Sequence, residues 1–170
     1  MSATEPTTRG AAEVARSYFE AIGRRDLEAM VRHWKPGASG SIHGLVDLTA
    51  PDTYRAWFGA LFAAFPDFEF EILDLVAEGE QAAVRWRATG SFTGPGTFEG
   101  MIANGRAVEM EGCDMVTVRD GLIVDNRAYM NAAEMARQLG AMPPRGSGRE
   151  RAMVEGINLT TRLSRLVRRE

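Results

Sequence analysis

The spacing of hydrophobic positions divides this chain into a helical first part and an alternating second part. In the first 65 residues, apolar side chains recur three or four positions apart in three segments, which predicts three helices. Thr7 or Thr8 is expected to cap the first helix and Asp26 the second, and Asp52 begins the third. A short extended piece over 41–48 precedes the third helix. The apolar stripes are Ala11, Val14, Ala15, Tyr18, Phe19 and Ile22, then Met30, Val31 and Trp34, then Tyr54, Trp57, Phe58, Leu61, Phe62 and Phe65.

From residue 68 onward, apolar and polar positions alternate, which is typical of half-buried strands. The pairs Asn104-Gly105 and Asp120-Gly121 each predict a hairpin, because both residues of such a pair tolerate positive φ. A run of antiparallel strands kept apart from the helices indicates an α+β fold. The expected strands run from residue 68 to a turn at 78–80, over 82–90, briefly within 91–100, over 106–118 and over 122–130, and a last short helix covers 132–139.

Residues 1–144 form the expected folded domain, and residues 145–170 form an arginine-rich tail. The tail carries apolar residues at roughly helical spacing, so it has two interpretations. It is an amphipathic helix that docks on a partner or a membrane surface, or it is a half-ordered solvated segment. We expect the solvated segment, and we do not expect a membrane as partner. The apolar residues are Met153, Ile157, Leu159, Leu163 and Leu166.

The formal net charge of −3 is unevenly distributed. Residues 145–170 carry seven arginines against three glutamates, and residues 1–144 carry −7 from 13 basic and 20 acidic residues. So acidic a domain lacks the basic surface that nucleic acid requires, and no nucleic-acid partner is expected. One cysteine and two histidines exclude a thiolate cluster and a three-histidine zinc site, and we expect no metal. The polar start lacks a signal pattern, so we expect a cytoplasmic protein.

Asp114 is the most informative position for chemistry, because it falls in phase with an apolar face of its strand. A carboxylate on such a face is costly unless it is paired, hydrogen-bonded or protonated, and burial raises its pKa. A neutral carboxyl group can donate to a developing oxyanion, and an ionised one can remove a proton next to a carbonyl group. The alternative is a structural aspartate paired with Arg127. The face consists of Val108, Met110, Gly112, Asp114, Val116 and Val118.

The last strand adds a set of polar groups that share one face in the predicted alternation. This face can line the mouth of a pocket or can be solvated. Its residues are Ile123, Asp125, Arg127 and Tyr129, with Asn131 next in phase.

Four further side chains are candidates for the same site. His43 lies in a glycine-flanked extended piece and is either a catalytic base or an exposed loop histidine. Tyr18 lies on the apolar stripe of the first helix, where its hydroxyl group needs a ligand or a backbone partner. Trp57 and Trp86 are expected to be core or pocket wall.

Several short motifs occur together in one known group of proteins. They are Phe65-Pro66-Asp67-Phe68, Val84-Arg85-Trp86 with Thr89-Gly90, Gly112-Cys113-Asp114 with Val118-Arg119-Asp120-Gly121, and Arg137-Gln138-Leu139-Gly140. Over about residues 11–143 the chain thus resembles the SnoaL-like polyketide cyclase group of the nuclear-transport-factor-2-like superfamily. The resemblance implies a cone-shaped, curved antiparallel sheet that encloses an apolar pocket with three N-terminal helices and a short C-terminal helix. It also implies a homodimer and catalysis without a cofactor.

The resemblance implies roles for individual residues as well. By similarity to the ketosteroid isomerases of the superfamily, Asp114 falls at an oxyanion-stabilising acid, Tyr18 at a tyrosine donor and His43 near the general base. In the cyclases an aspartate falls where this chain has Asn131, and an amide cannot take up a proton as a base.

Two hypotheses of different classes follow, and in both the protein binds a small hydrophobic organic molecule. The leading hypothesis is a cofactor-independent acid/base enzyme that cyclises, isomerises or dehydrates a small hydrophobic carbonyl compound. His43 would be the base, Asp114 and Tyr18 would stabilise the enolate oxygen, and Arg127 and Asn131 would orient polar substituents.

The second hypothesis is a non-catalytic binding or assembly module whose tail engages a partner. A third possibility, epoxide hydrolysis, requires Asp114, Asp125 and Arg127 to converge around one water molecule.

Overall fold

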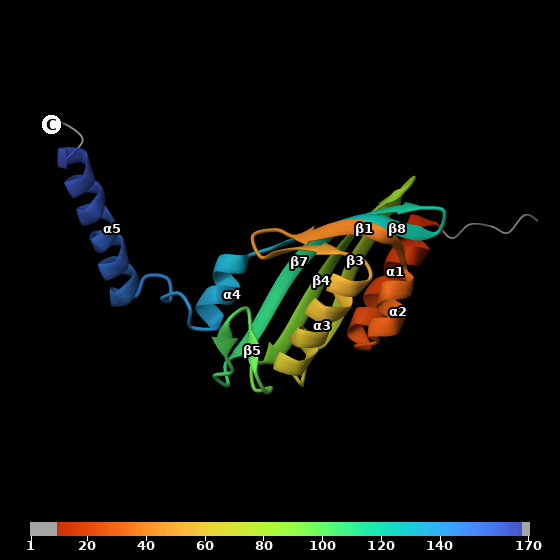
Figure 1. The fold of residues 1–170 in the computed structure, drawn as a ribbon, viewed down its shortest axis with the longest axis horizontal. Coiled ribbons are helices and arrows are strands. Elements are labelled where there is room, and N and C mark those ends of the chain that lie inside the picture. The colour runs from red at the N-terminus through yellow and green to blue at the C-terminus, as the bar shows by residue number, and fades with distance from the viewer. Residues whose placement is uncertain (1–9, 168–170) are drawn as a thin grey trace, which may run out of the picture.

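The computed structural model describes residues 10–167, in which a curved sheet packs against helices (Figure 1). Six strands follow the order β2-β1-β8-β7-β4-β3, and all neighbours are antiparallel except β1 and β8. The elements are α1 (Ala11–Gly23), α2 (Leu27–Arg32), β1 (Trp34–Ile42), β2 (Val46–Thr49), α3 (Asp52–Ala64), β3 (Glu69–Glu78), β4 (Gln81–Ser91), β5 (Thr97–Phe98), β6 (Met101–Ile102), β7 (Ala107–Arg119), β8 (Leu122–Met130), α4 (Ala132–Gln138) and α5 (Gly148–Val167). This arrangement confirms the α+β fold and its curved, mainly antiparallel sheet.

The three N-terminal helices form where the apolar spacing predicted them. The side chain of Asp26 accepts a hydrogen bond from the backbone N–H of Ala29 at 2.9 Å, which confirms it as the cap of α2. Thr7 and Thr8, the expected caps of the first helix, lie outside the described residues. The apolar stripe of α1 is buried against the sheet, where Phe19 stacks on Phe70 with ring centroids 5.8 Å apart.

The chain after α2 differs from the prediction. The apolar stripe was expected to extend the second helix to Trp34, but α2 ends at Arg32 and Trp34 begins β1. Trp34 pairs with Ile123 of β8, and the N–H of Ile123 donates to the carbonyl of His33 at 2.7 Å. Pairing with β8 satisfies backbone groups of a segment that Pro36 prevents from continuing as a helix.

The two predicted hairpins have different outcomes. Asp120 and Gly121, with φ of 52° and 75°, join the antiparallel strands β7 and β8, which confirms that turn. The prediction of a hairpin at Asn104-Gly105 is wrong, because the strands on its two sides do not pair with each other. β6 pairs with β5, and β7 pairs with β4. Gly105 instead donates its N–H to the carbonyl of Phe92 at 2.8 Å, so this segment returns the chain to the end of β4.

One extra residue in β8 decides which of its side chains face the helices. Thr117 pairs with Asp125 and Val118 with Ile123, so Val124 has no partner in the register and forms a bulge. Because of this extra residue, the odd-numbered residues after Val124 point to the opposite face of the sheet from Ile123. Asn126, Ala128 and Met130 therefore face the helices, while Asp125, Arg127 and Tyr129 face outward.

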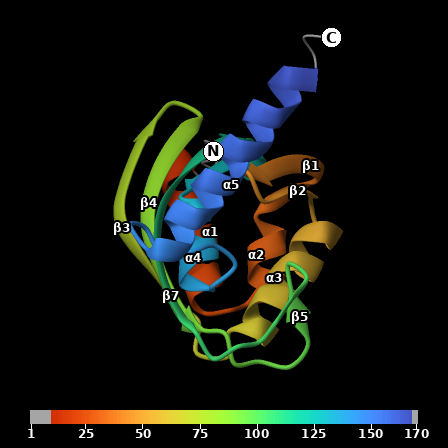
Figure 2. The ribbon, with the colours of Figure 1, turned by 90° about the vertical axis from the view of Figure 1, so that its left-hand side faces the viewer.

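The arginine-rich tail contains a continuous helix. Figures 1 and 2 show α5 projecting away from the sheet, beyond α4. Arg137 of α4 forms an ion pair of 3.8 Å with Glu150 in the first turn of α5. Every α5 side chain from Arg151 to Arg165 is exposed. The expected half-ordered segment is therefore a formed helix that does not pack on the domain.

Candidate functional site

A cavity of about 120 Å³ lies between the concave face of the sheet and helices α1 and α3. Its walls are mostly aromatic and aliphatic, which fits the usual composition of a small-molecule pocket. The apolar lining consists of Phe19, Ile22, Ile42, Leu45, Trp57, Phe58, Leu61, Phe65, Phe68, Phe70, Trp86, Ala88, Phe98, Val108, Met110, Ala128, Met130 and Met135. The polar lining consists of Tyr18, Ser41, Tyr54, Thr89, Asp114 and Asn126. The cavity therefore offers one carboxyl group, two phenols, two aliphatic hydroxyl groups and an amide among apolar walls.

Asp114 lies in the middle of β7 with its side chain turned inward and only 4% exposed. Directly opposite it in the sheet are Val84 of β4 and Ala128 of β8. Its diagonal neighbours on the same face are Trp86 and Asn126, and diagonal neighbours lie within reach of long side chains. The alternation of β7 and the inward position of Asp114 are thus as predicted.

Both oxygens of the Asp114 carboxyl group accept a hydrogen bond from a neighbouring strand. The indole Nε1–H of Trp86 donates to Oδ1 at 2.7 Å, and the amide Nδ2–H of Asn126 donates to Oδ2 at 2.7 Å. Each carboxylate oxygen keeps a second lone pair, so the group can still bind a ligand. Asp114 is not paired with Arg127, which was the structural alternative.

The environment of Asp114 raises the pKa of its carboxyl group from 3.8 to about 6. Burial is the largest cause, because it penalises the charged form. The hydrogen bonds from Asn126 and Trp86 act in the opposite direction, because they stabilise the carboxylate. The carboxyl group can therefore exchange a proton near neutral pH.

Two tyrosines from different helices lie close to this carboxyl group. Tyr18 of α1 is 1% exposed, and Tyr54 of α3 is 4% exposed. Burial raises the pKa of each phenol far above its usual range, and the charge of Asp114 raises both further. Both hydroxyl groups therefore stay protonated at physiological pH and can act as hydrogen-bond donors.

Two glycines make room for these side chains. A Cβ atom on Gly112, beside Asp114, would overlap ring atoms of Trp86. A Cβ atom on Gly40 in β1 would overlap the hydroxyl group of Tyr54. Larger residues at either position would displace the indole donor or the phenol from the carboxyl end of the cavity.

Among the predicted site residues, the structure brings Asp114, Tyr18, Trp57 and Trp86 together around the cavity. Trp57 contributes its ring to the wall and donates its Nε1–H to Glu99 at 2.9 Å. This is the position expected for these tryptophans.

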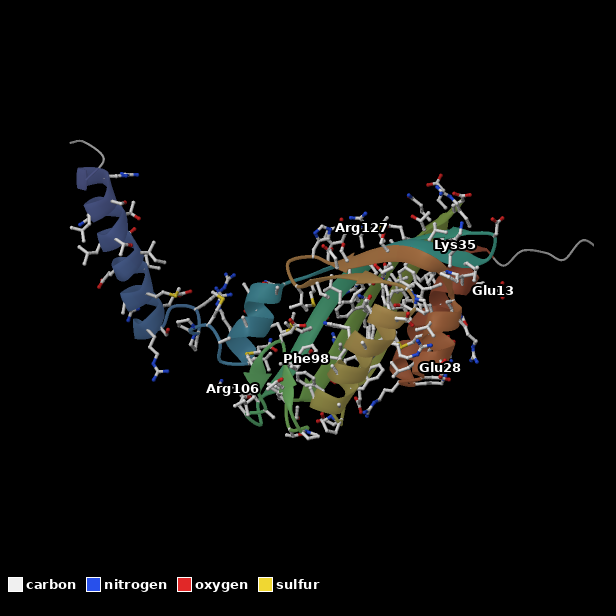
Figure 3. All side chains as sticks on the ribbon, viewed as in Figure 1. Glu13, Glu28, Lys35, Phe98, Arg106 and Arg127 are labelled. Carbon is white, nitrogen blue, oxygen red and sulfur yellow. The ribbon has the colours of Figure 1, made fainter. Side chains whose placement is uncertain are left out.

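The other four predicted site residues lie elsewhere. His43 is exposed and stacks on Tyr129, with ring centroids 4.4 Å apart, and Tyr129 itself is 48% exposed. Arg127 points outward (Figure 3) and pairs with Asp125 at 3.1 Å. Tyr129 and Arg127 are displaced to the outer face by the bulge in β8. None of these residues lines the cavity.

Asn131 has a local structural role. Its side-chain oxygen accepts the backbone N–H of Glu134 at 3.0 Å and caps α4. An Asn before a helix is a common cap, and this signal was available in the sequence. Asn131 is exposed and does not line the cavity, so the structure does not place it where it was expected to orient a substrate.

Sequence reasoning missed two site residues, Asn126 and Tyr54. Tyr54 was assigned to an apolar stripe, and nothing in its spacing shows that its hydroxyl group reaches the carboxyl end of the cavity. Asn126 was not among the candidates, because regular alternation placed Asp125, Arg127 and Tyr129 on the face of interest. The bulge at Val124 has no glycine or proline to mark it. Within residues 10–167, no group of three or more His, Cys, Asp or Glu side chains is arranged to hold a metal ion.

The sequence profile of SnoaL-like polyketide cyclases matches residues 12–139. This match includes most of the chain and all the cavity-lining residues, so the chain belongs to the SnoaL-like polyketide cyclase family. Its fold is the cone of the nuclear-transport-factor-2-like superfamily. No curated protein matches the sequence.

Solved structures of this fold carry descriptions of more than one reaction. A candidate SnoaL-like polyketide cyclase from Jannaschia sp. CCS1 shares 21% identity, with a TM-score of 0.70 over 84% of this chain and 100% of that chain. IdmH, a candidate polyketide cyclase from Streptomyces antibioticus, shares 28% identity, with a TM-score of 0.63 over 78% and 99%. An epoxide hydrolase of M. tuberculosis shares 16% identity, with a TM-score of 0.60 over 79% and 92%. The fold alone therefore does not specify the reaction.

Proposed function

We propose that this protein is a cofactor-independent acid/base enzyme that acts on a small hydrophobic carbonyl compound, and that Asp114 is its general base. The observation that carries the proposal is a carboxyl group with a pKa of about 6 at the polar end of an apolar cavity. A base with a pKa near the working pH combines a useful ionised fraction with sufficient basicity. This changes the role expected for Asp114 from oxyanion stabiliser to base.

The lining of the cavity supports this assignment. Asp114 is the one carboxyl group among the lining residues, and no histidine lines the cavity. His43, the base expected from the sequence, stacks on Tyr129 and would have to leave that stack to reach the cavity. The proposal therefore gives His43, Arg127 and Asn131 no part in the reaction.

In the proposed step, the Asp114 carboxylate takes a proton from the carbon next to the substrate carbonyl group. The C–H electron pair forms the enolate double bond, and negative charge develops on the carbonyl oxygen. Tyr18 and Tyr54 supply hydroxyl donors to that oxygen, and such preorganised donors stabilise developing charge. In a cyclisation, the enolate carbon then attacks a second carbonyl group of the same substrate, whose π electron pair moves to its oxygen, and that oxygen takes the proton from Asp114. In an isomerisation of an unsaturated ketone, Asp114 returns the proton to the γ carbon of the dienolate, which moves the double bond.

The cavity favours an uncharged, largely apolar substrate with one enolisable carbonyl group. No Lys or Arg side chain is among the lining residues, so nothing there balances a carboxylate or a phosphate. The aromatic walls from Phe58, Phe70 and Trp86 suit a planar ring. A polyketide fragment and a cyclic enone both meet these requirements.

Solvent deuterium exchange tests the proposal whichever product the enzyme forms. Small hydrophobic ketones are incubated with the protein in D₂O, and deuterium at the carbon next to the carbonyl group is followed by NMR. Wild type should catalyse exchange and Asp114→Asn should not, whereas Asp125→Asn on the outer face should match wild type. Equal exchange by wild type and Asp114→Asn would remove Asp114 from the mechanism.

A non-catalytic binding module remains the second candidate, because the same apolar walls suit a ligand that is only held. Ketones that bind to wild type and Asp114→Asn with equal affinity, and that no variant exchanges or converts, would favour this function. Epoxide hydrolysis by Asp114, Asp125 and Arg127 is not proposed, because the last two residues pair with each other outside the cavity.

A further inference from the structure

Helix α5 is an amphipathic surface that the proposed reaction does not use. Five of the nine large hydrophobic side chains exposed in the described residues belong to this one helix. They are Met153, Val154, Ile157, Leu159 and Leu163, and they are 39–58% exposed. Large apolar side chains gathered on an unpacked helix mark an interaction site.

From Arg151 onward, the charged residues of α5 lie on one side of the helix, whereas Arg149 and Glu150 lie outside that side. At about 100° per residue, Arg151, Arg162 and Arg165 fall within one sector, and Glu155 lies among them. The exposed apolar side chains occupy the rest of the circumference, together with small or uncharged polar residues such as Gly156, Thr160 and Ser164. The helix thus combines a wide apolar side with a narrow, mainly arginine strip.

The tail and the folded domain carry charges of opposite sign. Residues 145–170 have a surplus of four positive charges, whereas residues 1–144 carry −7. An anionic surface would therefore attract the tail and repel the domain. Since α5 projects from the domain and is tied to α4 only near its first turn, the tail can approach such a surface first (Figure 1).

We propose that α5 is a membrane-docking helix that lies in the interface of an anionic lipid bilayer. The apolar side chains would enter the boundary between headgroups and acyl chains, and the arginines would extend to lipid phosphates. The sequence favoured a half-ordered solvated segment over a docking helix, and the continuous helix in the structure now favours the docking helix. No described helix is long and apolar enough to cross a membrane.

A second copy of α5 is a less suitable occupant. A stable coiled coil needs about three to four heptads of apolar positions, and α5 has 20 residues. Its best heptad stripe contains Ala152, Gly156, Leu159, Leu163 and Leu166 in the sequence, of which the first two are too small to fill a helix interface. The stripe also leaves Met153, Val154 and Ile157 outside the contact. A lipid interface covers all of these side chains at once.

Docking would place the cavity beside the phase in which its ligand dissolves. An apolar molecule partitions into a bilayer, and a cone held at the bilayer surface meets it at high local concentration. The docking proposal itself rests on α5 and the charge distribution, and it does not depend on the reaction at Asp114.

Co-sedimentation of the full chain with sucrose-loaded vesicles tests the proposal. We expect binding to an equal mixture of phosphatidylcholine and phosphatidylglycerol, weak binding to phosphatidylcholine alone, and release by salt. Arg162→Gln with Arg165→Gln should lower the partition coefficient roughly 25-fold, at roughly fivefold per arginine. Arg119→Gln on β7, another exposed arginine, should leave it unchanged.

The apolar contribution has its own matched pair of variants. Ile157→Glu should abolish vesicle binding, whereas Val76→Glu, which adds the same charge at an exposed apolar position of β3, should retain it. Light scattering should show the same oligomeric state for both variants and wild type. The proposal fails if the wild type stays in solution with anionic vesicles, if Val76→Glu loses as much binding as Ile157→Glu, or if Ile157→Glu dissociates an oligomer.

Discussion

Replacing Asp114 with asparagine should make the protein more stable at neutral pH. The pKa of this carboxyl group is about 6 in the folded protein and 3.8 in its ordinary state. In the unfolded chain the group is ionised above pH 4, whereas in the folded protein burial keeps it protonated until about pH 6. The folded state therefore binds more protons between these two values, and the stability of the wild type falls as pH rises through this window.

The loss of stability in the wild type can be calculated from the pKa shift of Asp114. A difference of about two pKa units, at 1.36 kcal/mol each, gives about 3 kcal/mol of lost stability above pH 6. Below about pH 4 both states are protonated and this loss disappears. Asparagine is neutral throughout, so Asp114→Asn should gain stability over wild type by about 2 kcal/mol on going from about pH 4.5 to about pH 7.5.

The residues around position 114 can satisfy the hydrogen bonds of the amide that Asp114→Asn introduces. The side chain introduced by Asp114→Asn would still accept the indole N–H of Trp86 through its oxygen. Its NH₂ group would meet the NH₂ group of Asn126, but the Oδ1 atom of Asn126 is buried and has no hydrogen-bond partner. A rotation of the Asn126 amide would turn that oxygen toward the introduced amide and restore the hydrogen bond.

Urea unfolding of wild type and Asp114→Asn over this pH range measures the difference directly. Other carboxyl groups are common to both proteins, so their titration cancels in the comparison. Asp125→Asn is the matched control, and loss of its exposed pair with Arg127 should change stability by less than about 1 kcal/mol. A stability difference between wild type and Asp114→Asn that is constant across the range would refute the raised pKa.

Four further predictions concern the reaction. The rate of deuterium exchange should rise with pH around an apparent pKa near 6, because the Asp114 carboxylate is the active form. Trp86→Phe should raise this apparent pKa by about one pH unit, because the carboxylate loses a hydrogen-bond donor. Tyr18→Phe should lower kcat about 100-fold if its hydroxyl stabilises the enolate, whereas Tyr129→Phe on the outer face should leave kcat unchanged; equal rates for both variants would contradict the oxyanion role. His43→Ala should exchange deuterium at the wild-type rate, and a large loss would restore the histidine as base.

The local patterns of the chain located most helices and strands and turned the central carboxyl group of the site inward. Apolar spacing located α1, α3 and the long strands, because burial of one face repeats at 3.6 residues in a helix and at two in a strand. The alternation of β7 turned Asp114 inward with its apolar neighbours, since that strand contains no bulge between Val108 and Thr117. Asp26 was recognised as a cap because the contact spans only three residues.

The composition of the site depended on contacts between segments that are distant in sequence. Whether Arg127 or Asn126 faces the cavity is decided by one unpaired residue, Val124, since a shift of one position exchanges the two faces of a strand. The nearness of Tyr18 and Tyr54 to Asp114 depends on how two helices pack on the sheet. The position of His43 outside the cavity depends on the pairing of β1 with β8, which brings the histidine onto the ring of Tyr129.

The sequence by itself therefore determined the fold class and the inward carboxyl group, and the tertiary structure decided which groups surround that carboxyl group. The physical reason is the range of the interactions. Periodicity and capping act within a few residues and can be read along the chain. The pKa of Asp114 and its donors depend on burial and on strand register, which exist only after the sheet and helices have assembled.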